Sequence, residues 1–453
     1  MVRRTSVAVI GSGISGLSAA WLLSQRHQVT LYEAETRAGG HSNTVDVPGD
    51  QKPIPVDTGF IVYNTASYPN LIALFAHLDV PTAPTDMSFA VSLDSGAYEY
   101  AGSSLGTLFG QPSNVFRPDH WRMLRDTLRF FRDAPGLLTA AADHNTTLGD
   151  YLRHAGYSEA FAQRHILPMA AAIWSTPSRD VLAFPVAAFV RFFANHGLLQ
   201  VRNRPQWRTV VGGSREYVRR ILAATQGDVY LGQAVTRILR RPNEVVVATT
   251  AGEHAFDACI IATHADDALA LLADADVDEQ RLLGAFRYSR NLAVLHRDAR
   301  LMPQRRKLWS SWNYLSEHAK APPGQSSSLS VTYWMNKLQP LGVAAPDLFV
   351  TLNPARDIPA SDQLAQFTYT HPVFDAHAMA AQRHLWQLQG HRNTWFCGSY
   401  FGYGFHEDGL QSGLAAAEDL GGVRRPWTVP DESGRIYLRP GMAPPPTLRE
   451  AAE

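Results

Sequence analysis

The chain is 453 residues long, which is long for one hydrophobic core and predicts two intertwined domains. Hydrophobic residues make up 45% and charged residues 18%, as is typical of a globular protein. Lys plus Arg and Asp plus Glu both total 41, so the overall charge gives no indication of nucleic-acid binding. The two cysteines, Cys259 and Cys397, lie far apart, which excludes a disulfide framework and argues against a cysteine metal site.

The N-terminal residues are not expected to form a secretory leader. Arg3 and Arg4 precede an apolar run, but three glycines interrupt that run and no cleavage pattern follows it. No uninterrupted apolar stretch is long enough to cross a bilayer. We therefore expect a cytoplasmic protein that touches, at most, the inner face of a membrane as a peripheral protein.

The first predicted elements are a strand, a glycine-rich turn and a helix. Residues 6–10 are apolar and predict a buried parallel strand, and residues 17–25 predict a helix rich in Ala and Leu. Gly11 permits the tight turn, Gly13 allows backbone to approach a pyrophosphate, and Gly16 allows close packing of helix on strand. The residues expected to hold a dinucleotide here are Gly11, Gly13, Ser15 and Gly16.

A second strand over residues 28–32 ends at Glu33, which follows Gly11 by 22 positions. This is where an acid that binds a ribose belongs in a dinucleotide-binding βαβ unit. A GxGxxG motif alone is weak evidence for a dinucleotide-binding site, but a motif flanked by a strand, a helix and a terminal acid is strong evidence.

The residues after this acid favour a flavin over a nicotinamide. Residues 33–41, Glu-Ala-Glu-Thr-Arg-Ala-Gly-Gly-His, resemble the ExxxRxGG extension of flavin amine oxidases, phytoene desaturases and their relatives. The resemblance implies that Glu33 binds the adenosine ribose of FAD, while Arg37, Gly39 and Gly40 press on its pyrophosphate. The chemistry agrees, because a guanidinium forks onto phosphate oxygens. The family usually has arginine where His41 stands. The alternative to a flavin-binding segment is that residues 33–41 form an ordinary solvated loop.

Two further segments match the same families. Residues 56–62 predict a strand interrupted by Gly59, followed by Phe60, and the corresponding stretch passes the flavin ring in the superfamily. A plain core strand is the alternative. Residues 209–214, Thr-Val-Val-Gly-Gly-Ser, resemble the family's glycine-rich entry to a helix, and the resemblance places Val235 against the adenine through its backbone.

The last matching segment is a strand and turn over residues 394–399, then a glycine-rich run leading into an Ala-rich helix. Ser399 stands where the family usually has an acid. A helix beginning near Gly409 would point backbone N–H groups at the flavin O2. Cys397 is not at the covalent-flavin position of monoamine oxidases, so we predict non-covalent FAD. The residues expected to contact it here are Gly398, Ser399, Asp408, Gly409 and Leu410.

The predicted fold is α/β, with a discontinuous Rossmann-type FAD-binding domain and a mixed α+β substrate domain. The first comprises residues 1–86, 208–284 and 394–420, and the second comprises residues 87–207 and 285–393. The Pro-rich C-terminal tail, residues 421–453, is expected to form a poorly ordered arm.

A basic amphipathic helix is predicted within the first substrate insertion, over residues 118–131. Trp121, Leu124, Leu128 and Phe131 recur at helical spacing with arginines on the flanking faces. Such a helix could rest on an anionic membrane and admit a lipid. The favoured alternative is a surface helix that packs this stripe against its own core.

The candidate proton handlers lie in the aromatic and glycine-rich run before the last helix. They are His406, Tyr403 and Tyr400, which could exchange a proton or wall an apolar pocket; packing beneath the flavin ring is the alternative. His371 and His264 are weaker candidates, expected to be structural. No metal-ligand spacing is present, so no metal site is predicted.

The resemblance implies hydride transfer between a substrate carbon and flavin N5. Many amine-oxidising members carry a lysine in the first strand after the return to the substrate domain, but residues 285–295 contain none. This departure favours chemistry on a carbon–carbon bond. Residues 406–409, His-Glu-Asp-Gly, also resemble bacterial FAD-dependent oxidoreductases associated with modified fatty acids.

We therefore expect an FAD-dependent oxidoreductase that dehydrogenates, or desaturates, a lipid-like hydrocarbon chain and passes electrons to an acceptor that the sequence does not identify. A flavin-dependent double-bond isomerase or reductase is the first alternative, and an amine oxidase is the next. A protein with structural FAD and no turnover is the non-enzymatic alternative.

Overall fold

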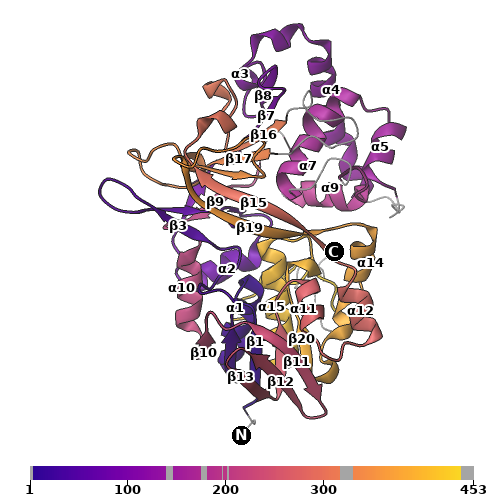
Figure 1. Cartoon of the computed structure of the whole chain (residues 1–453). Helices are drawn as coiled ribbons and strands as arrows, with labels where there is room; N and C mark the ends of the chain where they lie inside the picture. The colour runs from indigo at the N-terminus through magenta and orange to yellow at the C-terminus, as the bar shows by residue number, and fades with distance from the viewer. Residues whose placement is uncertain are drawn as a thin grey trace.

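The computed structural model describes residues 4–138, 146–174, 181–195, 197–200, 204–316 and 330–439. The two largest β-sheets form the centres of the two halves of the described structure (Figure 1). A parallel sheet lies in the lower half of the view near the N-terminus, and a mostly antiparallel sheet lies above it. Every helix within the described ranges is too short or too polar to cross a membrane.

The lower sheet has five strands in the order β10-β2-β1-β14-β20, and every neighbouring pair is parallel. Its central strand β1 is apolar because helices cover both faces of such a sheet. Val9 pairs with Leu31 and Ile260, and all three side chains are fully buried. The strands are β1 (Ser6–Ile10), β2 (Gln28–Tyr32), β10 (Gly227–Tyr230), β14 (Ala258–Ile261) and β20 (Thr394–Phe396). They come from residues 1–86, 208–284 and 394–420.

Two helices pack against each other beside this sheet, α1 (Ile14–Ser24) and α15 (His406–Gly421). A Cβ atom on Gly413 would lie 2.2 Å from the carbonyl oxygen of Ser15, so glycine is needed where α15 crosses α1. The neighbouring helices are α2 (Pro69–His77) and α10 (Arg215–Ala224). This half also contains a small antiparallel sheet of β11 (Val235–Arg241), β12 (Glu244–Thr249) and β13 (Gly252–Phe256). It further contains the helices α11 (Ala265–Leu271) and α12 (Val277–Leu283). Two short sheets complete it: β3 (Thr44–Val47) pairs with β4 (Ile54–Asp57), and β9 (Trp207–Val210) lies between β5 (Tyr63–Asn64) and β6 (Thr82–Thr85).

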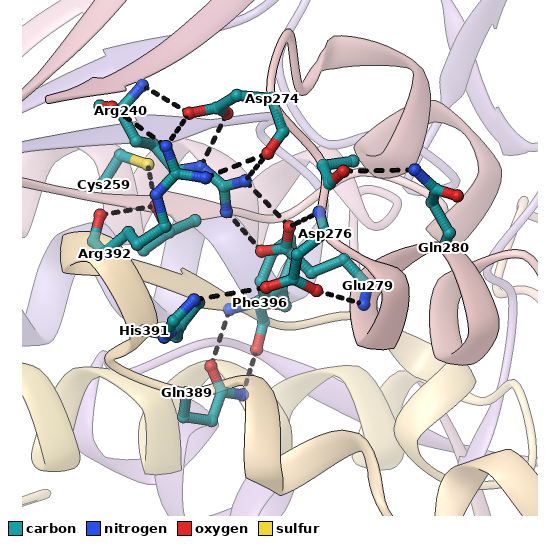
Figure 2. Close-up of polar contacts among 12 residues, drawn as sticks. Arg240, Cys259, Asp274, Asp276, Glu279, Gln280, Gln389, His391, Arg392 and Phe396 are labelled. Carbon is teal, nitrogen blue, oxygen red and sulfur yellow. Dashed lines mark hydrogen bonds and ion pairs between the residues drawn. The ribbon is translucent and has the colours of Figure 1, made fainter.

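A buried ion cluster fastens β11 to α12 (Figure 2). The side chains of Arg240 and Glu279 form an ion pair, and neither is exposed to solvent. Asp274 binds the same guanidinium at 2.9 Å and also pairs with Arg392. The buried Arg240 is thus neutralised by Glu279 and Asp274, and Arg392, 35% exposed, completes the cluster towards solvent, which meets the condition for burying charge.

The upper sheet has seven strands in the order β19-β15-β18-β17-β16-β7-β8, and only the β16–β7 pair is parallel. Its strands come from residues 87–207 and 285–393. The long strands β15 and β19 run from this sheet down towards the parallel one (Figure 1). The strands are β7 (Phe89–Leu93), β8 (Tyr98–Ala101), β15 (Arg287–His296), β16 (Trp312–Ser316), β17 (Ser330–Trp334), β18 (Phe349–Leu352) and β19 (Gln363–Val373).

Helices fill one side of the upper half (Figure 1). The apolar run over residues 184–193 lies largely in helix α9 (Val186–Asn195), whose Phe189 and Phe193 stack with ring centroids 4.2 Å apart and are fully buried. It is therefore a core helix. The other elements of this region are α3 (Leu105–Leu108), η1 (Pro112–Phe116), α4 (Pro118–Asp133), η2 (Ala134–Leu138), α5 (Leu148–His154), α6 (Glu159–Phe161), η3 (Ala162–Ile166) and α7 (Leu167–Trp174). Between β17 and α15 lie α13 (Met335–Leu338) and α14 (Ala376–Gln382).

The segment after α15 packs on the body of the protein. Arg425 is 2% exposed and its guanidinium pairs with Glu418 at 2.8 Å and with the Asn70 side chain at 2.9 Å. Trp427 stacks on Trp21 with ring centroids 5.8 Å apart. The prediction of a poorly ordered arm is wrong for residues 422–439, because buried charge pairs hold them. Residues 440–453 lie outside the described residues.

Candidate functional site

The turn after β1 has the backbone of a phosphate-binding loop. Gly11 has a φ of 98°, which side chains other than glycine rarely adopt, and a Cβ on Gly16 would lie 1.9 Å from the Gly11 carbonyl oxygen. At Gly13 a Cβ would meet no atom within 4 Å, so the space before α1 is open. No side chain caps the N-terminus of α1. Its first N–H groups, with the positive end of the helix dipole, are available to an anion.

Glu33 lies at the carboxyl end of β2, beside this turn. Its Oε2 accepts hydrogen bonds from the Ser12 backbone N–H at 2.8 Å and from the Ser12 hydroxyl at 2.5 Å. The strand that begins at Val235 lies close by, since the Gln233 backbone N–H donates to the Glu33 carbonyl at 2.9 Å. The structure thus brings together the acid and the backbone segment expected to bind an adenosine.

The loop after Glu33 closes over the first glycine turn. Gly39 and Gly40 have φ values of 115° and 56°, and a Cβ on Gly40 would lie 3.2 Å from the Gly13 Cα. Arg37 donates to the Gly40 carbonyl at 2.8 Å and pairs with Glu35 at 2.9 Å. The two glycine-rich turns therefore lie against each other, and the Arg37 guanidinium bonds the backbone of the second turn.

The Gly59 segment runs directly against the end of this loop. A Cβ on Gly59 would lie 2.1 Å from the His41 carbonyl oxygen, so only glycine fits there. The Phe60 backbone N–H donates to the same oxygen at 2.8 Å. The Phe60 ring stacks on His406 with centroids 3.7 Å apart.

Asp57 has a buried carboxylate that holds this segment to the glycine-rich start of α10. It was not among the predicted site residues. Asp57 accepts hydrogen bonds from the Ser214 backbone N–H and hydroxyl, both at 2.8 Å, and from the Thr44 hydroxyl at 2.6 Å. Burial raises the pKa of Asp57 to about 6 in spite of these bonds. Asp57 is a structural anchor, because its oxygens are already occupied.

The third predicted segment meets the start of α1. The Gly398 backbone N–H donates to the Ser412 hydroxyl at 3.0 Å, and Ser399 begins the short helix η9 (Ser399–Phe401). A Cβ on Gly409 would lie 2.9 Å from the Ile14 side chain, so α15 approaches the N-terminus of α1 at this glycine. Leu410 is fully buried beside it.

The Asp408 carboxylate is occupied within the protein. It accepts hydrogen bonds from the Tyr403 backbone N–H at 3.0 Å and the Phe405 backbone N–H at 2.8 Å, and it pairs with Arg435 at 3.1 Å. Burial raises its pKa. Any contact that residues 408–410 make with a cofactor therefore comes from their backbone.

His406 is locked in a polar and aromatic cluster. Its Nε2 lies 3.0 Å from the Ser42 hydroxyl and 3.1 Å from the Tyr217 hydroxyl. Burial lowers the pKa of His406 to about 3, so the imidazole is neutral at physiological pH. The two hydroxyls are themselves 2.5 Å apart, which makes a connected hydrogen-bond path.

Tyr400 and Tyr403 contact other neighbours. Tyr400 is 1% exposed, and its ring packs so closely on Gly398 that a Cβ there would lie 2.5 Å from Cε1 of the ring. Its ring centroid is 5.3 Å from that of Phe286. Tyr403 is half-buried, and the Arg191 guanidinium on α9 opposes the rise in pKa that burial gives it. Burial also raises the pKa of Tyr400, so both phenols stay protonated.

A histidine cluster lies where the Gly40 loop, the end of β14 and strand β19 meet. The His41 ring centroid is 5.4 Å from that of His371, 6.2 Å from that of His264 and 5.1 Å from that of Tyr369. Burial lowers the pKa of all three histidines, that of His371 to about 4. His371 and His264 were predicted to be structural and His41 was considered only beside the glycine-rich loop; the position of His264 at the carboxyl end of a parallel strand was the usable signal.

The tautomer of His371 follows from a chain of hydrogen bonds. The Leu292 backbone N–H donates to Oδ1 of Asn353 at 3.0 Å, which fixes the orientation of that amide. Nδ2 of Asn353 donates to Oδ1 of Asn291 at 2.8 Å, and Nδ2 of Asn291 then donates to Nδ1 of His371 at 2.9 Å. Nδ1 is therefore an acceptor, and the neutral imidazole carries its hydrogen on Nε2.

The arrangement fits FAD. The open space at Gly13, the uncapped end of α1 and the guanidinium of Arg37 suit a pyrophosphate, and Glu33 ends the second strand as a ribose-binding acid does. All of these groups lie outside the carboxyl ends of parallel strands, where open α/β sheets bind ligands.

Solved structures with this fold include enzymes of different activities. Cyclohexylamine oxidase from Brevibacterium oxydans IH-35A matches with a TM-score of 0.66 and 15% identity, covering 93% of this chain and 99% of its own. Putrescine oxidase bound to putrescine gives 0.65 and 15%, covering 92% and 99%. The CLA-producing fatty acid isomerase from P. acnes gives 0.64 and 15%, covering 92% and 97%. At this identity the likeness shows the fold alone.

A search of the curated proteins finds no match. The family described as flavin-containing amine oxidoreductase matches residues 14–339, which is more than half of the chain. This match confirms the predicted superfamily and its cofactor, and the shared fold confirms the Rossmann-type α/β class. The chain therefore belongs to the flavin-containing amine oxidoreductase family, and it is an enzyme that uses FAD.

Proposed function

We propose that this enzyme dehydrogenates an uncharged, lipid-like hydrocarbon chain and leaves a carbon–carbon double bond. The proposal rests on one observation: the polar groups gathered between the Gly59 segment, β15 and β19 are neutral. With pKa values lowered to about 4 and about 3, His371 and His406 are uncharged at physiological pH, and burial acts on His41 in the same direction. Asn291 and Tyr369 complete this group.

A neutral site discriminates against a charged substrate. Alkylamines are cations in water, and removing a cation from water without a charge partner is costly. The hydrogen bonds and ring contacts of His371 and His406 are made with asparagine, serine, tyrosine, phenylalanine and histidine side chains. Strand β15 contains no lysine, whereas many amine-oxidising relatives carry one on this strand; its buried polar side chains are Asn291 and His296. Both features support an uncharged substrate.

FAD, when bound, supplies the acceptor for a hydride from the substrate. The adjacent carbon loses a proton, and we assign its removal to the hydrogen-bond path of His406, Ser42 and Tyr217, in which the weakly basic imidazole passes the proton on instead of holding it. His371 offers its Nε2–H as a hydrogen-bond donor and acts as a positioning residue. Tyr400 and Tyr403 stay protonated and form apolar walls. Turnover then needs an acceptor that removes two electrons.

The same observation is compatible with isomerisation, which is redox-neutral, or with reduction of a double bond in an uncharged chain. Isomerisation or reduction of a double bond needs the flavin to be reduced beforehand, which distinguishes it from dehydrogenation. The similar structures do not decide between these reactions, because they include a fatty acid isomerase and amine oxidases. Amine oxidation remains the third candidate.

The test is the anaerobic absorbance spectrum of the purified enzyme, before and after addition of phospholipids with unsaturated or methyl-branched chains. Bleaching of the oxidised flavin by lipid supports dehydrogenation. An unchanged spectrum, with lipid isomerised only by pre-reduced enzyme, assigns the isomerase. Hydrogen peroxide produced from an amine panel assigns the amine oxidase.

Two matched variants connect the reaction to the site. His371→Gln keeps a hydrogen-bonding side chain but loses the imidazole, and we expect it to slow bleaching by about tenfold or more while FAD is retained. His384→Gln alters an exposed histidine after α14 and serves as the control. Equal bleaching rates for the two variants would show that His371 does not position the substrate.

A further inference from the structure

We propose that helix α4 and the two short elements before it form a docking surface for an anionic phospholipid bilayer. This surface lies at the outer edge of the upper half of the molecule (Figure 1). It rests on exposure and charge, and it does not depend on the reaction proposed above. The residues of this docking surface are Leu105, Val115, Phe116, Trp121, Arg125, Leu128 and Arg132.

Large apolar side chains are concentrated on this surface. Phe116 is 86% exposed, Leu105 77%, Leu128 61% and Trp121 51%. With Val115 they make five of the twelve exposed large hydrophobic residues in the described part of the chain. Single exposed hydrophobic residues are ordinary, whereas a cluster marks a binding surface.

The outward stripe of α4 alternates apolar and basic residues. Positions 121, 125, 128 and 132 are spaced by four, three and four residues, so they lie on one face of the helix. The opposite face carries the buried residues His120, Met123, Asp126 and Phe130. The favoured prediction that the apolar stripe packs on the core is wrong for Trp121 and Leu128, although Leu124 and Phe131 do pack there.

Trp121 is held in an orientation that suits insertion. Its indole N–H donates to the Val115 carbonyl at 2.9 Å, so the donor is satisfied while half of the ring remains exposed. The ring centroid lies 5.1 Å from that of Phe109, which extends the apolar surface towards α3. An aromatic ring with a satisfied donor can enter the interface of a bilayer without losing a hydrogen bond to water.

The segment 117–133 has a net positive charge, because it carries five arginines against three aspartates. The Arg125 and Arg132 side chains are 70% and 74% exposed. Arg125 pairs with Asp126, which is fully buried and accepts a hydrogen bond from the Ser158 backbone N–H at 2.9 Å, whereas Arg132 pairs at 2.6 Å with Asp133, 39% exposed. Exposed guanidinium groups between exposed apolar side chains match the phosphates and the acyl boundary of an anionic bilayer. This complementarity selects lipid as the occupant over a second copy of the chain.

The first test is sedimentation of the FAD-loaded enzyme with vesicles. We expect binding to vesicles of phosphatidylcholine mixed with phosphatidylglycerol and little binding to phosphatidylcholine alone. Because exposed charges are screened, about 0.5 M NaCl should weaken this binding at least tenfold. Absence of binding to the anionic vesicles at low salt would overturn the proposal.

Paired variants assign the binding to this surface. Phe116→Ser with Leu128→Ser removes apolar contact, and Arg125→Gln with Arg132→Gln removes charge. The matched controls are Val277→Ser with Val343→Ser, at sites 79% and fully exposed, and Arg237→Gln with Arg281→Gln, at sites 55% and 56% exposed. We expect at least a tenfold loss for each surface pair and none for the controls, with unchanged thermal unfolding. Equal binding by all four would overturn the proposal.

A probe on the helix reports insertion directly. Both native cysteines are buried, so the variant Leu128→Cys can be labelled selectively with an environment-sensitive dye such as NBD. Anionic vesicles should shift its emission to the blue, and a label at Val343→Cys should not respond. If instead the wild type self-associates in solution and Leu128→Ser abolishes this, the surface binds a second copy and the lipid proposal fails.

Discussion

Nδ2 of Asn291 donates a hydrogen bond to Nδ1 of His371 at 2.9 Å, which joins β15 to β19 on the side of the histidine cluster. The two residues are not direct partners in the sheet, because Asn291 pairs with Tyr369 and His371 pairs with Ser289. The contact is diagonal between neighbouring strands, as long polar side chains allow. It holds the imidazole in its neutral form, since an amide N–H cannot donate to a protonated nitrogen.

This contact and the burial of His371 make the stability of the protein depend on pH. The pKa of His371 is lowered from 6.5 to about 4 in the folded chain. Between these values the unfolded chain binds a proton that the folded chain does not. The contribution is therefore complete above pH 6.5 and is lost as pH falls towards 4, by about 1.4 kcal/mol per pH unit. His120, His165 and His296, with pKa values also lowered to about 4, act in the same direction.

Urea unfolding at about pH 7, 6 and 5 measures this dependence. The variant His371→Gln should reduce its slope by about 1.4 kcal/mol per pH unit in this range. His384→Gln is the control, because the His384 side chain is exposed. An unchanged slope in His371→Gln would contradict the burial of this imidazole.

Two glycines of the β1 turn should separate cofactor binding from folding. A Cβ at Gly13 meets no atom within 4 Å and the φ of this residue is −62°, so Gly13→Asp should change the stability of the apoprotein by less than about 1 kcal/mol. Its carboxylate would oppose a pyrophosphate, and we expect FAD affinity to fall by about 100-fold or more. Gly16→Ala should instead destabilise the apoprotein by about 2 to 4 kcal/mol, because its Cβ would lie 1.9 Å from the Gly11 oxygen.

Thermal unfolding of the apoprotein and flavin absorbance after gel filtration measure the two effects. Gly13→Ala is the control for side-chain volume without charge. Normal FAD retention by Gly13→Asp would show that the pyrophosphate does not bind at this turn.

The ion pair of Arg240 and Glu279 should be sensitive to loss of one partner. Both side chains have no exposed surface, so Glu279→Gln leaves the guanidinium with a weaker set of partners inside the protein. We expect the free energy of unfolding to fall by about 3 kcal/mol. Glu244→Gln is the matched control on the neighbouring strand, because its pair with Arg241 is half exposed and should contribute less than about 1 kcal/mol. Denaturant unfolding of both variants makes the comparison, and similar losses would contradict this account.

The parts of the site that are local in sequence could be predicted, and those assembled across the sheets could not. Gly11, Gly13 and Glu33 lie within one βαβ unit, whose spacing follows from the lengths of a strand, a turn and a helix. The cluster of His41 and His371 depends on how β19 is placed against β15, which no local pattern encodes.

Helix α4 shows why periodicity alone is insufficient. The spacing of apolar residues predicted the helix, but it did not determine which face of the helix is buried. Two polar residues lie on the buried face because other elements supply their hydrogen-bond partners. His120 is hydrogen-bonded to the Tyr98 hydroxyl at 2.8 Å, and Asp126 accepts a hydrogen bond from the Ser158 backbone N–H. Tertiary partners thus override the ranking of side chains by hydrophobicity.

The packed segment after α15 leads to the last prediction. Arg425 pairs with Glu418 and its side chain has no exposed surface, whereas the pair of Arg281 and Asp278 on α12 is 56% and 67% exposed. Arg425→Ala removes a buried cation and leaves Glu418, 15% exposed, and the Asn70 amide without their partner. Its cost should be about 3 kcal/mol, against less than about 1 kcal/mol for Arg281→Ala, which breaks an exposed pair. Because this segment covers α2 and α15, Arg425→Ala should also speed proteolysis after Gly421 in the native protein. Equal stability and equal cleavage of the two variants would mean that residues 422–439 are a detached arm after all.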